Sequence, residues 1–114
     1  MHEIGIMSST LAAVAAEVRR QGATRVERIL LRVGALSGAE PAALQFAFAA
    51  VSPGTAAAGA VLEIELLPAR AVCPDCAVEF EAGPGFITAC PRCRRFCGEL
   101  RQGRELELTR IEMT

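Results

Sequence analysis

The chain has 114 residues, of which 52% are hydrophobic, and this size fits one compact domain with a small appendage. Its net charge is −1, with 12 basic residues against 13 acidic ones, which excludes binding to nucleic acid through a general excess of positive charge. No segment is apolar over the length of a membrane span, and the apolar start lacks the basic residues of a signal peptide. We therefore expect a cytoplasmic protein without a membrane span.

The first third of the chain predicts a helix followed by a strand. Gly22 is a stop signal after a run of apolar residues at helical spacing, which predicts a helix over residues 3–21. The apolar residues of this helix are Ile4, Met7, Leu11, Val14 and Val18. Residues 24–34 are rich in β-branched and other apolar side chains, which is typical of a strand.

The sequence then predicts a second helix and two more strands. Pro41 suits the first position of a helix because its missing N–H would have no partner there. Residues 61–67 alternate between apolar and acidic side chains, which indicates a half-buried strand. Residues 105–113 alternate in the same way, but the phase changes near Thr109 or Arg110, so we expect a last strand with a β-bulge.

Two Cys-Pro-x-Cys motifs stand between these strands, and they supply four of the five cysteines: Cys73, Cys76, Cys90 and Cys93. In a cytoplasmic chain, such pairs indicate metal or redox chemistry rather than disulfides. A two-residue gap lets both sulfurs of one tight turn face a single ion, and two such turns complete a tetrahedron. The motifs therefore predict a structural Zn²⁺ site. An iron–sulfur centre and a dithiol redox pair are the alternatives, and they fit a duplicated motif less well.

The cysteine segment, residues 71–102, is too small to bury a core of its own, so we expect the metal to fold it. Between the motifs, residues 78–81 and 86–88 flank a Gly-Pro-Gly turn and predict a short hairpin. Cys97 lies outside both motifs and is interpreted as a small packed or surface thiol. The alternative is a spare ligand that exchanges with Cys93 when the metal or redox state changes.

These elements predict an α+β fold, with two helices on a roughly three-stranded mixed sheet and an inserted zinc-ribbon lobe. Residues 1–70 and 103–114 form the α/β lobe in this interpretation, and residues 71–102 form the zinc-ribbon lobe. The last strand is expected to return to the sheet of the first lobe.

His2 is the only histidine, and it stands where the first helix is expected to begin. The amides of residues 2 and 3 have no partner within the helix, so a metal can displace their protons without breaking the helical hydrogen bonds. The α-amine of Met1, two amide nitrogens and the imidazole of His2 could form a planar set of four nitrogens, which Ni(II) or Cu(II) favours. A disordered terminal histidine is the simpler alternative.

Several segments in a fixed order carry a resemblance to a known family: Met1-His2-Glu3, the helix ending at Gly22, residues 31–37, residues 59–64, the two Cys-Pro-x-Cys motifs and residues 103–106. They cover nearly the whole chain. In this order they resemble the HypA/HybF family of hydrogenase maturation nickel metallochaperones.

The resemblance implies that nickel binds at the amino terminus through Met1, His2 and Glu3, and that the four paired cysteines hold zinc. It implies that nickel is cargo for the precursor of the [NiFe]-hydrogenase large subunit, with a nickel GTPase as partner. Some relatives also serve urease, and a homodimer is left open. Some relatives use an additional histidine near the zinc lobe, but this chain has no second histidine, and Cys97 matches none of the family's ligands.

We expect no enzymatic activity, because a four-sulfur site leaves no position for water and His2 has no paired nucleophile. The main alternative function is a zinc-ribbon module that binds nucleic acid or a transcription complex. It is suggested by the arginines near the second motif: Arg92, Arg94, Arg95, Arg101 and Arg104. The scarcity of aromatic side chains weighs against base stacking. A thiol oxidoreductase would need an accessible cysteine of low pKa.

Overall fold

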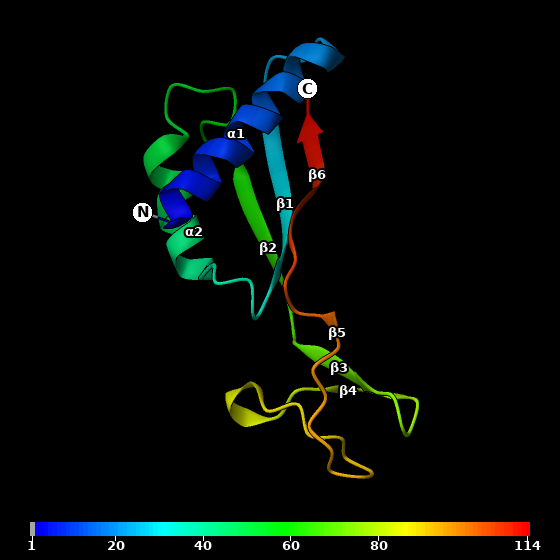
Figure 1. The fold of residues 1–114 in the computed structure, drawn as a ribbon. Coiled ribbons are helices and arrows are strands. Elements are labelled where there is room, and N and C mark those ends of the chain that lie inside the picture. Colours follow the sequence, from blue (N-terminus) through cyan, green and yellow to red (C-terminus); the bar gives the residue numbers. More distant parts are fainter. Residues whose placement is uncertain (1) are drawn as a thin grey trace.

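The structure, a computed structural model, describes residues 2–114 and has an elongated shape with extents of 54 × 27 × 17 Å. Its elements are α1 (His2–Gln21), β1 (Val26–Gly34), α2 (Pro41–Val51), β2 (Val61–Leu67), β3 (Arg70–Cys73), β4 (Val78–Glu81), the short 3-10 helix η1 (Pro84–Phe86), β5 (Leu100–Gln102) and β6 (Leu106–Met113). Both helices lie beside a first sheet, and a second sheet extends from one end of it (Figure 1).

The first sheet has the strand order β2-β1-β6, with β1 parallel to β2 and antiparallel to β6. The expected fold of two helices on a three-stranded mixed sheet is therefore confirmed, as is the return of the last strand to this sheet. The expected bulge is also confirmed. Leu30 faces Arg110 and Leu31 faces Leu108, so Thr109 has no register partner on β1.

The core lies between the helices and one face of the first sheet. The buried residues of α1 are Met7, Leu11, Val14 and Val18, which are four of the five that the helical spacing predicts. Alternate residues of β1 pack against these side chains: Ile29, Leu31 and Val33. The apolar face of α2 completes the core with Leu44, Ala47 and Phe48. Each large aliphatic side chain buried in this way contributes about 1.5–3 kcal/mol.

Both helices have well-formed ends. Gly22 has a φ of +67°, and the amides of Gly22 and Ala23 donate to the carbonyls of Arg19 and Val18, which closes α1 with a Schellman motif. Pro41 opens α2 as expected, and the carboxylate of Glu40 accepts a hydrogen bond from the amide of Ala42. Within residues 2–114, neither helix has the length and apolar character required to cross a membrane.

The second sheet is antiparallel throughout and has the strand order β4-β3-β5. The prediction of a hairpin between residues 78–81 and 86–88 is wrong, because β4 pairs with β3 instead. The first Cys-Pro-x-Cys motif is itself the turn that joins β3 to β4, so it supplies the hairpin. Residues 84–86 form η1, and only an isolated bridge joins Gly83 to Ile87.

The two sheets meet where the backbones of Gly34 and Gly103 touch. A Cβ atom on Gly34 would overlap the backbone of Gly103, and one on Gly103 would lie 2.9 Å from the Cα atom of Ala69. Gly103 also has a φ of +132°, which residues with side chains rarely adopt. The amide of Leu36 donates to the carbonyl of Gly103 (N···O 2.7 Å), so this contact is hydrogen-bonded as well as close.

We expect Gly34→Ala to lower the free energy of unfolding by about 1–3 kcal/mol or more, because backbone atoms must move apart to admit the methyl group. Gly5→Ala is the matched control, since a Cβ there meets nothing within 4 Å. That control should gain about 0.5–1 kcal/mol, as a glycine replaced inside a helix does. Urea denaturation of both variants measures the difference, and a Gly34→Ala protein as stable as the parent would contradict the contact.

Candidate metal centres

The first Cys-Pro-x-Cys motif is a tight turn between two strands. Cys73 is the last residue of β3, and it pairs with Val78, the first residue of β4. The amide of Ala77 donates to the carbonyl of Cys73 (N···O 2.8 Å), and Ala77 itself has a φ of +55°. This turn brings the sulfur of Cys76 back toward that of Cys73.

The second motif repeats this geometry. The amide of Arg94 donates to the carbonyl of Cys90 (N···O 2.8 Å), and Arg94 has a φ of +64°. A bridge between Ala89 and Phe96 closes the turn, in the place that the β3–β4 pair takes at the first motif. The duplicated sequence therefore folds into a duplicated turn.

The two turns bring all four sulfurs together. The sulfurs of Cys73, Cys76, Cys90 and Cys93 lie within 4.8 Å of one another, and those of Cys73 and Cys93 are 3.6 Å apart. Four sulfurs bound to zinc at about 2.3 Å stand about 3.8 Å apart in a regular tetrahedron, so the cluster fits a zinc ion. Cys73 and Cys90 are buried and Cys93 is exposed, which leaves an approach for the metal from solvent.

The charges of the cluster also call for a cation. The backbone amide of Cys76 points at the Cys73 sulfur, and it lowers the pKa of this thiol from 9.0 to about 6. The neighbouring Cys93 thiol, followed by burial, raises the pKa of Cys76 to about 12. Four thiolates this close repel one another, and a divalent ion among them removes the obstacle to ionisation. A bound Zn²⁺ would supply structural cross-linking in a closed site.

An ion pair joins the two motifs on the surface. The guanidinium of Arg95, beside the second motif, lies 2.7 Å from the carboxylate of Asp75 in the first. Both side chains are more than half exposed, so the pair contributes about 0–1 kcal/mol. Sequence spacing gave no indication of this pairing, because the two residues are 20 positions apart.

Cys97 is buried next to the four-sulfur group but is not one of its members. Its thiol donates to the carbonyl of Arg95 (S···O 3.3 Å), and its own amide and carbonyl both bond to Thr88. Burial raises the pKa of the Cys97 thiol. This environment agrees with the interpretation of a packed thiol.

The predicted nickel ligands fall at the other metal candidate, the start of α1. Met1 lies outside the described residues. His2 is exposed in the first turn, and its Nε2 atom stands 3.9 Å from where a Cβ of Gly38 would be. His2 also lines one end of a groove between α1 and β6, together with Leu106. Glu3 is half-buried beside it. His2 and Glu3 are adjacent at the start of α1, which lies beside the first sheet. The second sheet, which carries the cysteines, lies at a distance from them (Figure 1).

The loop under His2 is a feature that sequence analysis did not connect with the metal ligands. Gly38 has a φ of +84°, and the hydroxyl of Ser37 accepts a hydrogen bond from the amide of Ala39 (N···O 3.2 Å). This positive φ favours glycine at position 38, and the imidazole of His2 lies close beside it. The only signal in the sequence was the Ser37-Gly38 pair itself. This pair indicates a turn, but it does not indicate that His2 lies beside that turn.

The paired turns and their four sulfurs define the chain as a metal-binding protein with a four-cysteine site of the zinc type. A family model described as "Hydrogenase/urease nickel incorporation, metallochaperone, hypA" matches residues 1–113. The chain is 41% identical over 113 residues to the hydrogenase maturation factor HypA of Desulfitobacterium hafniense, covering 99% of this chain and 98% of that protein. It is 40% identical to the HypA of Chloroflexus aurantiacus over 112 residues, covering 98% of each.

Solved structures agree in fold. The solution structure of the nickel metallochaperone HypA from Helicobacter pylori has a TM-score of 0.66 at 22% identity, covering 97% of this chain and 96% of that one. A second HypA solution structure has a TM-score of 0.74 at 24% identity, covering 100% and 97% of the two chains. The chain therefore belongs to the HypA family of nickel-incorporation metallochaperones and hydrogenase maturation factors.

We expect Cys90→Ser to lose its zinc and the order of the second sheet, since structural zinc contributes about 10–16 kcal/mol in small zinc-binding peptides. Cys97→Ser is the matched control, because Cys97 lies just after the second motif in the sequence but is not a member of the four-sulfur cluster. It should keep its zinc. Elemental analysis and hydrogen exchange of β3 and β4 provide the readout, and equal zinc content in the two variants would contradict the assigned ligands.

Proposed function

We propose that this chain binds Ni(II) at its amino terminus and delivers it for maturation of a [NiFe]-hydrogenase, while a structural Zn²⁺ holds the second sheet. The observation that carries the proposal is the exposed His2 in the first turn of α1, on a chain of the HypA family.

The start of α1 suits nitrogen ligation of nickel. The first amide groups of a helix have no carbonyl partner within it, so those of His2 and Glu3 can lose their protons to a metal at no cost to the helical ladder. The positive end of the helix dipole stabilises the negative charge that results. The α-amine of Met1, these two amide nitrogens and the His2 imidazole then make a planar set that Ni(II) favours.

The same position suits release. His2 is exposed, so a partner's ligands can replace the imidazole without unfolding the chain. Copper binds such nitrogens more tightly than nickel, and selectivity in the cell then depends on metal supply and on partner docking. We infer a cytoplasmic carrier rather than an enzyme, with a nickel GTPase and the hydrogenase large-subunit precursor as partners. The hydrogenase maturation names of the relatives support this inference.

The nucleic-acid alternative receives less support from the structure. Two of the five arginines that suggested it are already in ion pairs, Arg95 with Asp75 and Arg101 with Glu99. Arginines neutralised in this way contribute less to counterion release from a phosphate backbone.

We expect His2→Ala to weaken nickel binding by about a hundredfold or more, because losing a ligand costs more than the roughly 10–100-fold lost with a group that only orients a ligand, while zinc content and melting temperature stay unchanged. One residue added before Met1 should weaken binding almost as much, because it displaces the α-amine from the nickel plane. The same addition after Thr114 is the matched control and should have no effect. Isothermal titration with nickel compares all four proteins.

Equal nickel affinity in the four proteins would place the nickel elsewhere and contradict the proposal. Loss of nickel binding together with zinc loss would instead show that His2→Ala disturbs the fold, and the amino-terminal addition then decides the question.

A further inference from the structure

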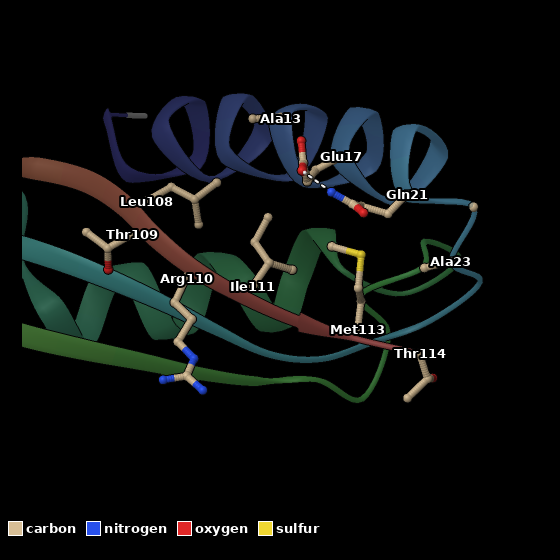
Figure 2. A pocket seen from close by; sticks show the side chains of 11 residues that line it. Ala13, Glu17, Gln21, Ala23, Leu108, Thr109, Arg110, Ile111, Met113 and Thr114 are labelled. Carbon is tan, nitrogen blue, oxygen red and sulfur yellow. Dashed lines mark hydrogen bonds between the residues drawn. The ribbon is translucent and has the colours of Figure 1, made fainter.

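A long groove runs between α1 and β6, on the side of the first sheet where β6 is the edge strand. Its volume is about 740 Å³, and its floor is formed by the apolar residues of β6 (Figure 2). On β1, Ile29 and Leu31 are buried by the helices. Their register partners on β6, Ile111 and Leu108, are only half-buried. The apolar face of the sheet therefore continues to its edge without being covered there.

The two edges of this sheet differ. At the β2 side, the amide side chain of Gln45 donates to the carbonyl of Leu62 (N···O 2.7 Å), which gives the β2 backbone a partner from α2. Within residues 2–114, no side-chain hydrogen bond reaches the backbone of Leu106–Met113. A long strand edge with unpaired backbone groups is a ready template for another strand.

The charges of β6 lie on the opposite face from the groove. Figure 2 shows the side chains of Leu108, Ile111 and Met113 directed toward α1, while that of Arg110 points away. Arg110 is 67% exposed, and its guanidinium lies 3.2 Å from the carboxylate of Glu112, two positions along the same face. Glu112 also lies 3.5 Å from Arg28 of β1. Positive and negative charge thus alternate along the free edge, with Ile111 between them.

This alternation is self-complementary. When two β6 strands pair antiparallel about a twofold axis perpendicular to the sheet, both copies keep their helices on the same side. With Ile111 opposite Ile111, Arg110 of each copy meets Glu112 of the other, and Thr109 meets Met113. A shift by two residues in either direction brings Arg110 against Arg110 or Glu112 against Glu112, which is repulsive.

We propose that a second copy of this chain docks on the β6 edge in the register centred on Ile111. The two first sheets then form one continuous sheet of six strands, and the paired segment, residues 108–114, is the β6 side of the groove. The copy covers the half-buried Leu108, Ile111 and Met113, and Arg110 and Glu112 then pair across the interface as well as within each chain. His2 and Leu106 lie in the neighbouring groove beyond the paired segment, so the proposed nickel site at the start of α1 stays accessible in both copies.

Charge reversal tests the register. Arg110→Glu and Glu112→Arg each place like charges opposite one another in both symmetric pairs, and each should weaken self-association by about tenfold or more. A mixture of the two variants should restore it, because each chain of one variant then meets opposite charges on the other. Arg101→Glu is the matched control on β5 and should leave self-association unchanged. Sedimentation equilibrium of the zinc-loaded chain measures all of them.

Hydrogen exchange of the parent chain gives a second readout that needs no substitution. Amides of residues 108–114 should exchange more slowly at high protein concentration, while those of β2 should not change. A parent chain that stays monomeric, or a dimer insensitive to both reversals, would overturn the proposal. So would protection of residues 108–114 only when another protein is added, because a foreign strand would then occupy this edge. None of these outcomes depends on nickel, so the metal proposal is tested separately.

Discussion

The arrangement of both metal candidates depends on the backbone contact between Gly34 and Gly103. Gly34 is the last residue of the central strand β1, and Gly103 follows β5 as the chain leaves the second sheet. The carbonyl of Gly103 also accepts a hydrogen bond from the amide of Leu36, and Gly103 lies close against Ala69. Any side chain at Gly34 would force these strands apart. One close contact therefore fixes where the cysteine-bearing sheet is attached.

The same end of the first sheet carries the amino-terminal candidate. The loop that follows β1 contains Leu36, which bonds to Gly103, and Gly38, which lies under the imidazole of His2. A few residues of one loop thus contact both the root of the second sheet and the start of α1. This arrangement keeps the two candidate ligand sets separate, with the cysteine sulfurs in the second sheet and His2 at the helix start. The four sulfurs suit zinc, and the nitrogen set that we propose at the helix start would suit nickel.

Sequence patterns predicted the first sheet well and the second poorly, for a physical reason. α1, β1, α2, β2 and β6 are long enough to show helical or alternating periodicity, and the phase change at Thr109 even located the bulge. β3 and β5 have only four and three residues, and their pairing is set by the cysteine turns rather than by alternation. The motif spacing predicted the four-sulfur cluster, but contacts between distant residues, such as Gly34 with Gly103, left no local signal.

We propose that this one chain binds zinc through sulfur and nickel through nitrogen. X-ray absorption at both metal edges, on one sample loaded with zinc and nickel, measures the neighbours of each ion. We expect four sulfur neighbours at about 2.3 Å around zinc, and only nitrogen and oxygen neighbours around nickel. Sulfur neighbours at the nickel edge, or nitrogen neighbours in place of sulfur at the zinc edge, would contradict the separation of the two sites.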